Sequence, residues 1–314
     1  MLSFILRRII SLVPVLLGMT IAVFVVMNIV PGDAAYARLG MEATPELLAR
    51  YRAEYGLDRP WLVRLGDWLW SVARFDFGRS LMTSQPILPD ILIRLPATFE
   101  LALVATLVSI AIGLPLGVLA AWYRNSWLDV LGRMVMLLGL SMPNFWLALL
   151  LILWLSLGLG VLPTAGYAPL TEDPLRNLRY ITLPALTLGV SMAAVVARFT
   201  RSSLIDVMRQ DYVRTAIGKG ASPRRFLWRH ALRNALIPVV TVVGMQMGTL
   251  LGGTVIVEDI FAWPGLGRFA LEYIYNRDYP VIQTVVLFMA VFYVVINLLV
   301  DLAYVAIDPR IEYR

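Results

Sequence analysis

Long runs of hydrophobic residues without a charged side chain dominate the chain. Six such runs occur, at residues 10–30, 101–123, 134–162, 180–197, 234–257 and 279–300. Each is close to or longer than the roughly 20 residues that an α-helix needs to cross the hydrocarbon core of a bilayer. The pattern predicts an all-α, polytopic membrane protein with six transmembrane helices.

The lengths of three runs affect how they are interpreted. The first run, 10–30, is longer than the hydrophobic part of a signal peptide, so we expect a retained helix. The run 134–162 is longer than one span requires, which indicates a tilted helix or a run that ends at the membrane interface. The run 180–197 is the shortest of the six. Each run is counted as one span.

Basic residues gather on one side of the predicted spans. With six spans both termini lie on the same side, where the short connections contain Arg124 and Arg133 and the segment 198–233. That segment carries nine Lys or Arg residues against Asp206 and Asp211. Because Lys and Arg are enriched in cytoplasmic loops, we expect this side and both termini to be cytoplasmic.

The opposite side carries one long segment, from residue 31 to residue 98. Thr44 and Pro45 form a helix start and Gly56 a stop, which predicts a helix of about eleven residues. The stretch 61–72 repeats apolar residues at helical spacing and predicts a second helix. Two interpretations stay open, a lid packed on the spans or a contact surface for an extracytoplasmic partner. The chain thus divides into an N-terminal transmembrane helix (1–30), an extracytoplasmic segment (31–98) and a five-helix core (99–314).

The composition excludes several kinds of chemistry. The chain has no cysteine, and its one histidine, His230, lies in the basic segment. We therefore predict no metal site and no catalytic residue. The sequence contains no G-x-x-x-x-G-K-[ST] motif for nucleotide binding. A secondary transporter would show charged residues or paired broken helices inside the spans, and we expect neither here. A membrane-embedded Ser-His hydrolase is disfavoured because His230 lies outside the spans.

Small and flexible residues cluster in the fifth run. Gly244, Gly248 and Gly252 repeat every four residues and permit close helix packing. A solute pathway is the alternative use of this region, since methionine adapts its shape and glutamine forms hydrogen bonds. The candidate pathway residues are Met245, Gln246, Met247 and Gly253.

The basic segment also has an internal pattern. Helical propensity continues from Ser202 to Ile217, and the glycines that follow break the chain before Ser222 and Pro223 start a second helix. The arginines of that second helix, Arg225, Arg229 and Arg233, recur at helical spacing opposite an apolar face. Such a helix binds anionic lipid or docks on a protein, and both interpretations stay open. We expect no nucleic acid there.

Several motifs resemble those of bacterial ABC importer permeases. They are Asp211 to Ala216, Gly220 and His230 to Pro238 in the basic segment; Pro31 to Asp33, Leu95 to Thr98 and Glu100; Ser141, Pro143 and Phe145; Trp263 to Gly267; Arg277 to Pro280; and Asp308 to Arg310. Over its full length the chain is similar to the first permease subunit of the dipeptide, oligopeptide, nickel and glutathione group. The residues from Ala197 to Ser203 are most similar to the glutathione-type branch.

One motif departs from the general importer pattern. That pattern begins Glu, Ala, Ala, whereas this chain has Arg214, Thr215 and Ala216. The peptide subgroup has the same departure. The acidic contact to the ATPase that other importers use therefore does not transfer to Arg214.

The resemblance implies a type I ABC importer permease that works by alternating access in the bacterial cytoplasmic (inner) membrane. The implied solutes are dipeptides, oligopeptides or glutathione. The implied partners are a second homologous permease in a heterodimer, two ABC ATPases that hold ATP and Mg²⁺, an extracytoplasmic solute-binding protein and membrane lipid. Within the implied coupling loop, 198–235, the residues that contact the ATPase are expected to be Arg214, Thr215, Ala216, Lys219, Gly220, Ala221, Ser222 and Pro223. No cofactor is expected in this chain.

Overall fold

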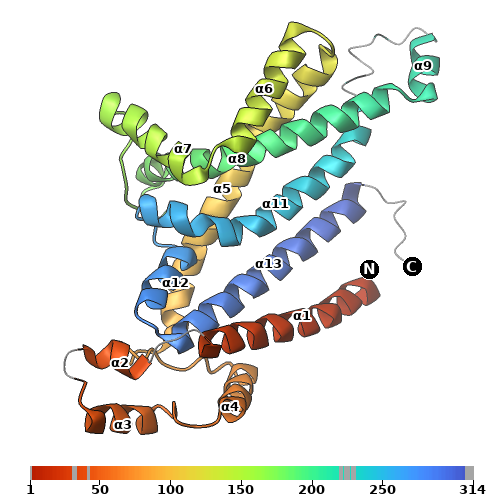
Figure 1. Cartoon of the computed structure of the whole chain (residues 1–314). Helices are drawn as coiled ribbons and strands as arrows, with labels where there is room; N and C mark the ends of the chain where they lie inside the picture. Colours follow the sequence, from red (N-terminus) through yellow and green to blue (C-terminus); the bar gives the residue numbers. More distant parts are fainter. Residues whose placement is uncertain are drawn as a thin grey trace. The chain divides into compact units, whose positions relative to one another are not determined.

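The computed structural model describes residues 2–29, 34–40, 43–218, 222, 227 and 231–307. Within these ranges the chain is built from α-helices and contains no β-strand, apart from one isolated bridge between Arg79 and Pro86. The predicted all-α class is confirmed. The helices form two compact units (Figure 1): unit 1 combines residues 1–98 with 264–294, and unit 2 combines residues 99–263 with 295–314.

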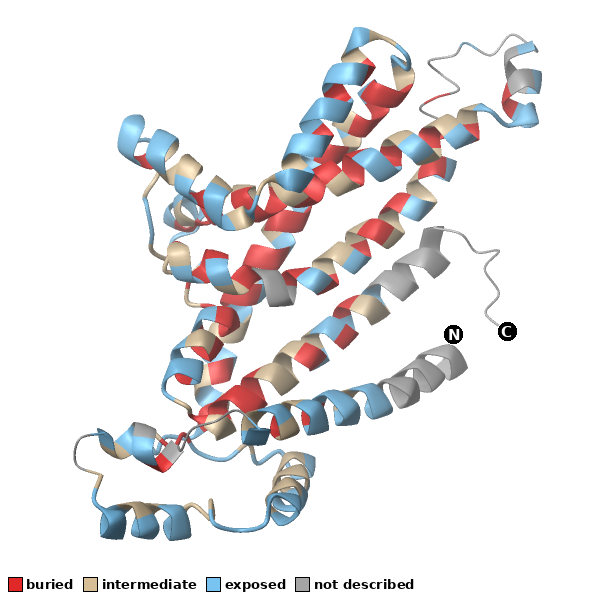
Figure 2. Ribbon diagram, in the orientation of Figure 1, coloured by how far each residue is buried: buried red, intermediate tan, exposed pale blue. Residues whose placement is uncertain are grey.

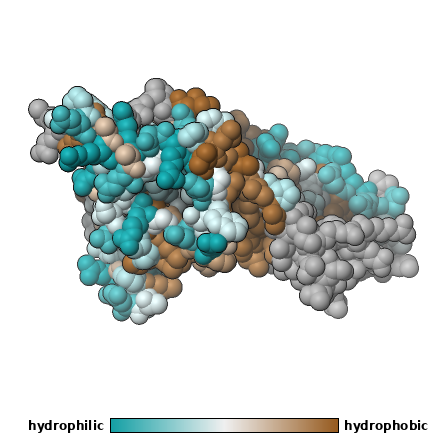
Figure 3. Space-filling model, turned by 90° about the horizontal axis from the view of Figure 1, so that it is seen from below, coloured by the Kyte–Doolittle hydropathy of each residue, from teal (hydrophilic) through white to brown (hydrophobic). Residues whose placement is uncertain are grey.

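Unit 1 combines apolar helices with the long polar segment. Its helices are α1 (Leu2–Ile29), α2 (Ala34–Leu39), α3 (Pro45–Glu54), α4 (Trp61–Ala73), the first part of α5 (Ile87–Trp122), α12 (Leu266–Tyr275) and most of α13 (Tyr279–Ile307). Their hydrophobic core consists of Ile87, Ile91, Leu266, Phe269, Ala270, Tyr273, Val281, Ile282 and Val285. Hydrophilic side chains gather on the end that carries α2 and α3, beside a band of hydrophobic ones (Figure 3).

Both predicted helices of the segment 31–98 are confirmed. Helix α3 begins after Thr44, whose side-chain oxygen accepts a hydrogen bond from the backbone N–H of Leu47 at 3.3 Å. This is the usual N-cap arrangement, with Pro45 in the first turn. Helix α4 covers the apolar repeat and extends to Ala73. Helices α2 and α12 were not predicted.

Unit 2 is organised around α8 (Pro174–Met208). Around it lie the second part of α5, α6 (Trp127–Ser141), α7 (Asn144–Leu151), a π-helix η2 (Ile152–Gly158), α9 (Asp211–Gly218) and α11 (Leu232–Ile260). Helix α8 carries a nearly continuous series of buried residues (Figure 2). Its 35 residues exceed the predicted run 180–197, because the helix continues through arginines at both ends. Long charged side chains reach the membrane surface from such positions.

Glycines set the distance between α5 and α8. A Cβ atom on Gly117 would lie 2.5 Å from the carbonyl oxygen of Ala197, and one on Gly113 would lie 2.6 Å from that of Ala193. On the other helix, a Cβ on Gly189 would lie 2.5 Å from a methyl carbon of Val108. Only a hydrogen side chain fits at these three positions. Close backbone approach of this kind is typical of helices packed within membranes.

The membrane-spanning helices are partly interrupted. Among the described residues, α5, α8 and the part of α13 from Tyr279 to Leu299 are each long and apolar enough to span a membrane. Two further spans are bent pairs, and the described apolar part of α1, Val13–Ile29, is short. By length and composition the structure gives three to five candidate spans. It thus supports a multi-span membrane protein, while the count of six stays a prediction.

The run 134–162, counted above as one span, is not one straight helix. Helix α6 ends at Ser141, and the following helical segment, Asn144–Gly158, turns away by 103°. The cause is Pro143, which lacks a backbone N–H and forces Met142 before it into an extended conformation, with φ −81° and ψ 122°. The fifth run is also bent, by 57°, between Leu250 and Thr254.

The expected absence of broken helices is therefore wrong. One of the two features that spoke against a secondary transporter is thereby lost.

The predicted helix from Ser202 to Ile217 is likewise two helices. Helix α8 ends at Met208, and α9 begins at Asp211. Between them the N–H groups of Arg209 and Gln210 bond to the carbonyls of Asp206 and Val207 in a tight turn. An acidic residue in the first turn of a helix is favourable, so Asp211 marks the new start.

We expect Gly117→Ala to destabilise unit 2. The added methyl group has no room against Ala197, and overpacking of this kind costs about 1–3 kcal/mol. Thermal unfolding of the purified protein in detergent measures the effect. The control is Gly66→Ala on α4, where an added Cβ meets nothing within 4 Å. Equal midpoints for the two variants would show that α5 and α8 tolerate a wider separation.

Candidate functional site

Helix α9 is attached to the ends of three other helices through a buried side chain. Val213 is 3% exposed and belongs to a hydrophobic cluster with residues of α5, α8 and α11. The cluster consists of Val118, Ala121, Leu204, Val207, Val213, Leu227, Ala231, Leu232 and Ala235. Burial of this apolar surface holds a short helix that would be only marginally stable alone. We call this the anchoring cluster.

Two hydrogen bonds reinforce the anchoring cluster. The hydroxyl of Ser203 on α8 donates to the carbonyl oxygen of Ala235 on α11, at 3.0 Å. The side-chain amide of Asn234 donates to the hydroxyl of Tyr212 on α9, at 3.1 Å. The start of α11 is thereby tied to both α8 and α9. The three helices form a connected end of unit 2.

The structure describes only part of the predicted coupling residues. Arg214, Thr215 and Ala216 lie on α9, and Thr215 is exposed, with its hydroxyl donating to the carbonyl oxygen of Asp211 at 3.0 Å. Ser222 is exposed. Lys219, Gly220, Ala221 and Pro223 lie outside the described residues, as do Arg225 and Arg229 of the predicted second helix. At the end of that helix Arg233 is exposed and Leu232 and Ala235 are buried, as its pattern predicts.

A buried ion pair, missed by the sequence analysis, connects α6 to α8. The side chain of Asp129 is 1% exposed, and both its oxygens accept hydrogen bonds from Arg201, at 2.7 Å from Nε and 2.9 Å from Nη2. The N–H of Asn125 adds a bond at 3.1 Å. The sequence did single out this carboxylate, because Asp129 is the only acidic residue between Leu101 and Leu162. Its isolation could have suggested a partner.

The candidate pathway residues do not share one surface of α11. Met245 is 65% exposed, whereas Gln246 donates a hydrogen bond from its amide to the carbonyl oxygen of Met192 on α8, at 3.1 Å. Met247 is half-buried. Gly253 lies on α11 beside the bend, and its surroundings are not described. Gly244 and Gly248 are buried, which fits their predicted packing role.

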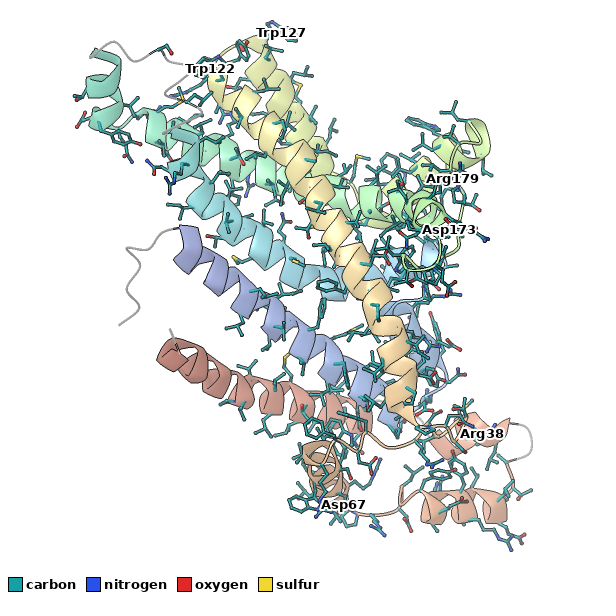
Figure 4. The ribbon with its side chains drawn as sticks, turned by 180° about the vertical axis from the view of Figure 1, so that it is seen from behind. Arg38, Asp67, Trp122, Trp127, Asp173 and Arg179 are labelled. Carbon is teal, nitrogen blue, oxygen red and sulfur yellow. The ribbon has the colours of Figure 1, made fainter. Side chains whose placement is uncertain are left out.

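At the other end of unit 2 two loops pack on each other. The N–H of Gly166 donates to the carbonyl oxygen of Phe261 at 2.9 Å, and the ring of Tyr167 meets that of the fully buried Trp263 edge to face. A pocket of about 510 Å³ lies nearby, lined by residues 160–163 and by polar residues at the start of α8, among them Asp173 and Arg179 (Figure 4).

In unit 1 one carboxylate holds the polar segment in place. Asp278 is fully buried at the start of α13, and its Oδ2 accepts from the hydroxyl of Ser80 at 2.6 Å and from the N–H of Met82 at 3.1 Å. The hydroxyl of Tyr51 donates a hydrogen bond to the carbonyl oxygen of Leu81 at 2.7 Å. Burial raises the pKa of this hydroxyl to about 12, so it is protonated and can donate at physiological pH. Helices α3 and α4 have no buried residue. The loop is therefore fixed, and these helices remain available for contacts.

Among the described residues no cluster of His, Cys, Asp or Glu is arranged to hold a metal ion. The structure instead brings several helix ends together at one site. A short polar helix is attached through the anchoring cluster to the ends of three long apolar helices.

Two family models match the chain. Residues 113–313 match the model described as binding-protein-dependent transport system inner membrane component, and residues 1–102 match the model of the N-terminal part of such membrane components.

Relatives match over the full length. A protein of Brucella suis biovar 1 named as a peptide transport system permease is 46% identical over 313 residues, covering 100% of both chains. A dipeptide transport system permease of Alkalihalophilus pseudofirmus is 42% identical, and a glutathione transport system permease of Salmonella typhimurium is 41% identical, each covering 100% of both chains.

A solved structure shares the fold. An inward-facing form of the MetNI methionine ABC transporter superposes with a TM-score of 0.60 at 21% identity. The match covers 72% of this chain and 100% of that one. The type of permease fold that the sequence predicted is thereby confirmed.

We expect Asp129→Ala to destabilise the protein by about 3–5 kcal/mol, because it leaves the Arg201 guanidinium without its buried partner. The matched control is Asp67→Ala, which removes the ion pair between Asp67 and Arg59. Both of these side chains are 63% exposed. Exposed pairs contribute about 0–1 kcal/mol, so this variant should unfold near the native midpoint. Similar thermal midpoints for both variants would contradict a structural role for Asp129.

Proposed function

Because the chain belongs to the family of binding-protein-dependent transport system inner membrane components, we propose that it imports peptides or peptide-like solutes as the permease subunit of an ATP-driven transporter. The names of its relatives support this solute class, since they include peptide, dipeptide and glutathione systems. The chain itself is a membrane permease and not an enzyme. Its sequence lacks the phosphate-binding motif of ATPases, so ATP hydrolysis takes place on separate subunits.

The anchoring cluster is the observation that carries the coupling role. A force applied to α9 reaches α5, α8 and α11 directly, because Val213 packs among residues near the ends of all three. Interfaces packed in this way move as units and do not deform gradually. We therefore assign α9 and the residues up to Pro223 as the element that engages an ATPase subunit, with Mg²⁺ and ATP bound by that subunit.

The bends in the spans support a pathway along α11. A bend in a membrane helix is tolerated where neighbouring helices, polar side chains or ordered water satisfy the backbone groups that it frees. The bend between Leu250 and Thr254 follows Met245, Gln246 and Met247 and includes Gly253. We propose that this region faces the solute when the second permease is present.

The remaining partners follow from the family. We propose a heterodimer with a second homologous permease, two ATPase subunits on the side of α9, and a solute-binding protein on the side of the segment 31–98. The side of α9 and the two termini are then cytoplasmic. The fixed loop at Ser80, together with helices that have no buried residue, gives the binding protein a stable surface.

Reconstitution tests this assignment. The chain is purified with its second permease and ATPases, inserted into vesicles with the binding protein, and supplied with labelled dipeptide, oligopeptide or glutathione. We expect ATP-dependent uptake of at least one of these solutes. Uptake driven by a proton or sodium gradient without ATP would establish the competing secondary-transporter function.

We expect Gly220→Trp to abolish solute uptake while the complex still assembles and hydrolyses ATP. A bulky side chain in the coupling element disturbs its fit with the ATPase, so closure of the ATPases no longer moves the spans. Uptake and phosphate release are measured on the same vesicles. The matched control is Gly18→Trp on α1, where an added Cβ atom meets nothing within 4 Å. Unchanged uptake in the Gly220→Trp variant would remove this loop from the coupling element.

A further inference from the structure

A polar pocket lies where the α5–α6 turn meets the C-terminal part of α8. It encloses about 220 Å³ and is lined by Arg124, Asn125, Asp129, Arg133, Arg201, Ser202, Ile205 and Asp206. All of these residues belong to unit 2. The pocket lies outside the candidate coupling and pathway residues, and neither proposed role uses it.

The charges that line this pocket leave an excess of one positive charge. Three arginines face two aspartates, and Asp129 is already satisfied by two hydrogen bonds from Arg201. Arg133 lies 3.6 Å from the same carboxylate and its side chain is 55% exposed. Since each guanidinium has five N–H donors and Arg201 uses two for Asp129, donor capacity remains on the pocket wall. One anionic group of single charge fits this balance.

An exposed apolar stripe begins beside the pocket and runs along α6. It consists of Trp127, Val130, Leu131, Met134, Leu137 and Leu138, which recur every three or four residues and are each more than 40% exposed. The stripe is about 16 Å long at 1.5 Å per residue. Half of the roughly 30 Å hydrocarbon core of a bilayer is about 15 Å. The stripe therefore matches the depth of one lipid leaflet.

Tryptophan marks the polar end of this stripe. Trp127 is 71% exposed at the first residue of α6, and with Trp122 it lies at the tip of the α5–α6 hairpin (Figure 4). Tryptophan is enriched at the depth of lipid headgroups. Arg124 precedes Trp127 by three residues and lines the pocket, which puts the rim of the pocket near the expected depth of the lipid phosphates.

We propose that this pocket binds the phosphate of an anionic phospholipid, whose acyl chains lie along the Trp127–Leu138 stripe. Arginine recognises phosphate through paired N–H donors, and basic pockets between membrane helices bind anionic headgroups in this way. The adjoining stripe favours a lipid over free phosphate, because free phosphate gains nothing from apolar surface. The lipid would bridge the α5–α6 turn and α8, and so support the helix that leads to α9.

The test compares two double variants of the complete transporter complex. Arg124→Gln with Arg133→Gln removes two pocket arginines and keeps the Asp129–Arg201 pair. Arg209→Gln with Arg233→Gln removes the same charge from two exposed residues that do not line the pocket. Each complex is placed in phosphatidylcholine nanodiscs with or without phosphatidylglycerol, and the retained lipid is measured by native mass spectrometry together with the thermal midpoint.

We expect the native complex and the Arg209/Arg233 variant to retain phosphatidylglycerol and to gain thermal stability from it. The Arg124/Arg133 glutamine variant should lose about tenfold or more in apparent affinity, since two charge-assisted hydrogen bonds are removed. Lysine at both positions keeps the charge and should restore most of the binding, which also shows that a folded variant was tested.

Three results would overturn the proposal. Equal phosphatidylglycerol retention by the native and the Arg124/Arg133 glutamine complexes would show that the pocket is not a lipid site. An acidic side chain of a partner subunit would then be the alternative occupant of the pocket. Equal loss in the Arg209/Arg233 control would indicate general attraction to the basic surface. A thermal shift with inorganic phosphate as large as that with phosphatidylglycerol would identify a free-anion site.

Discussion

The close contact between α5 and α8 is the constraint on which the rest of unit 2 depends. Gly113 and Gly117 bring the backbone of α5 against carbonyl oxygens of α8. With its 35 residues α8 is about 52 Å long at 1.5 Å per residue, well beyond the roughly 30 Å of hydrocarbon. A helix of this length needs firm lateral support within the membrane to hold its ends in place, and the glycine contacts supply it.

The support continues toward α9. The Asp129–Arg201 pair fixes α8 to α6, and the Ser203 hydroxyl and the anchoring cluster fix it to α11. These contacts fall within a few residues of one another along α8, before the turn at Arg209. The turn breaks the helix without detaching it, since Val213 returns to the same cluster. The contacts made by Asp129, Arg201, Ser203 and Val213 thus connect the bundle to α9, the proposed coupling helix. These contacts are of different kinds, so a single substitution does not remove them all.

The sequence predicted most of the helices because their signals are local. Apolar runs marked the long helices, and Thr44 and Pro45 marked α3. The errors arose where tertiary contacts or backbone chemistry override hydropathy. A hydrophobic run does not report the conformational limits of Met142 before Pro143, so α6 and α7 were merged. Likewise, the burial of Asp129 depends on Arg201, 72 residues away, and no local pattern shows that pairing.

The bent helices change the argument that separates this transporter from ion-coupled ones. Broken helices occur in both classes, so their presence here does not decide between them. The discriminating feature is what the bends carry. Proton-coupled transporters carry ionisable side chains within their membrane helices to relay the proton. Here the break at Met142–Pro143 and the bend at Leu250–Thr254 contain only uncharged residues. The residues at the break and at the bend themselves offer a proton relay no titratable group. We propose that the energy instead comes from ATP hydrolysis on separate subunits and that the anchored α9 receives it.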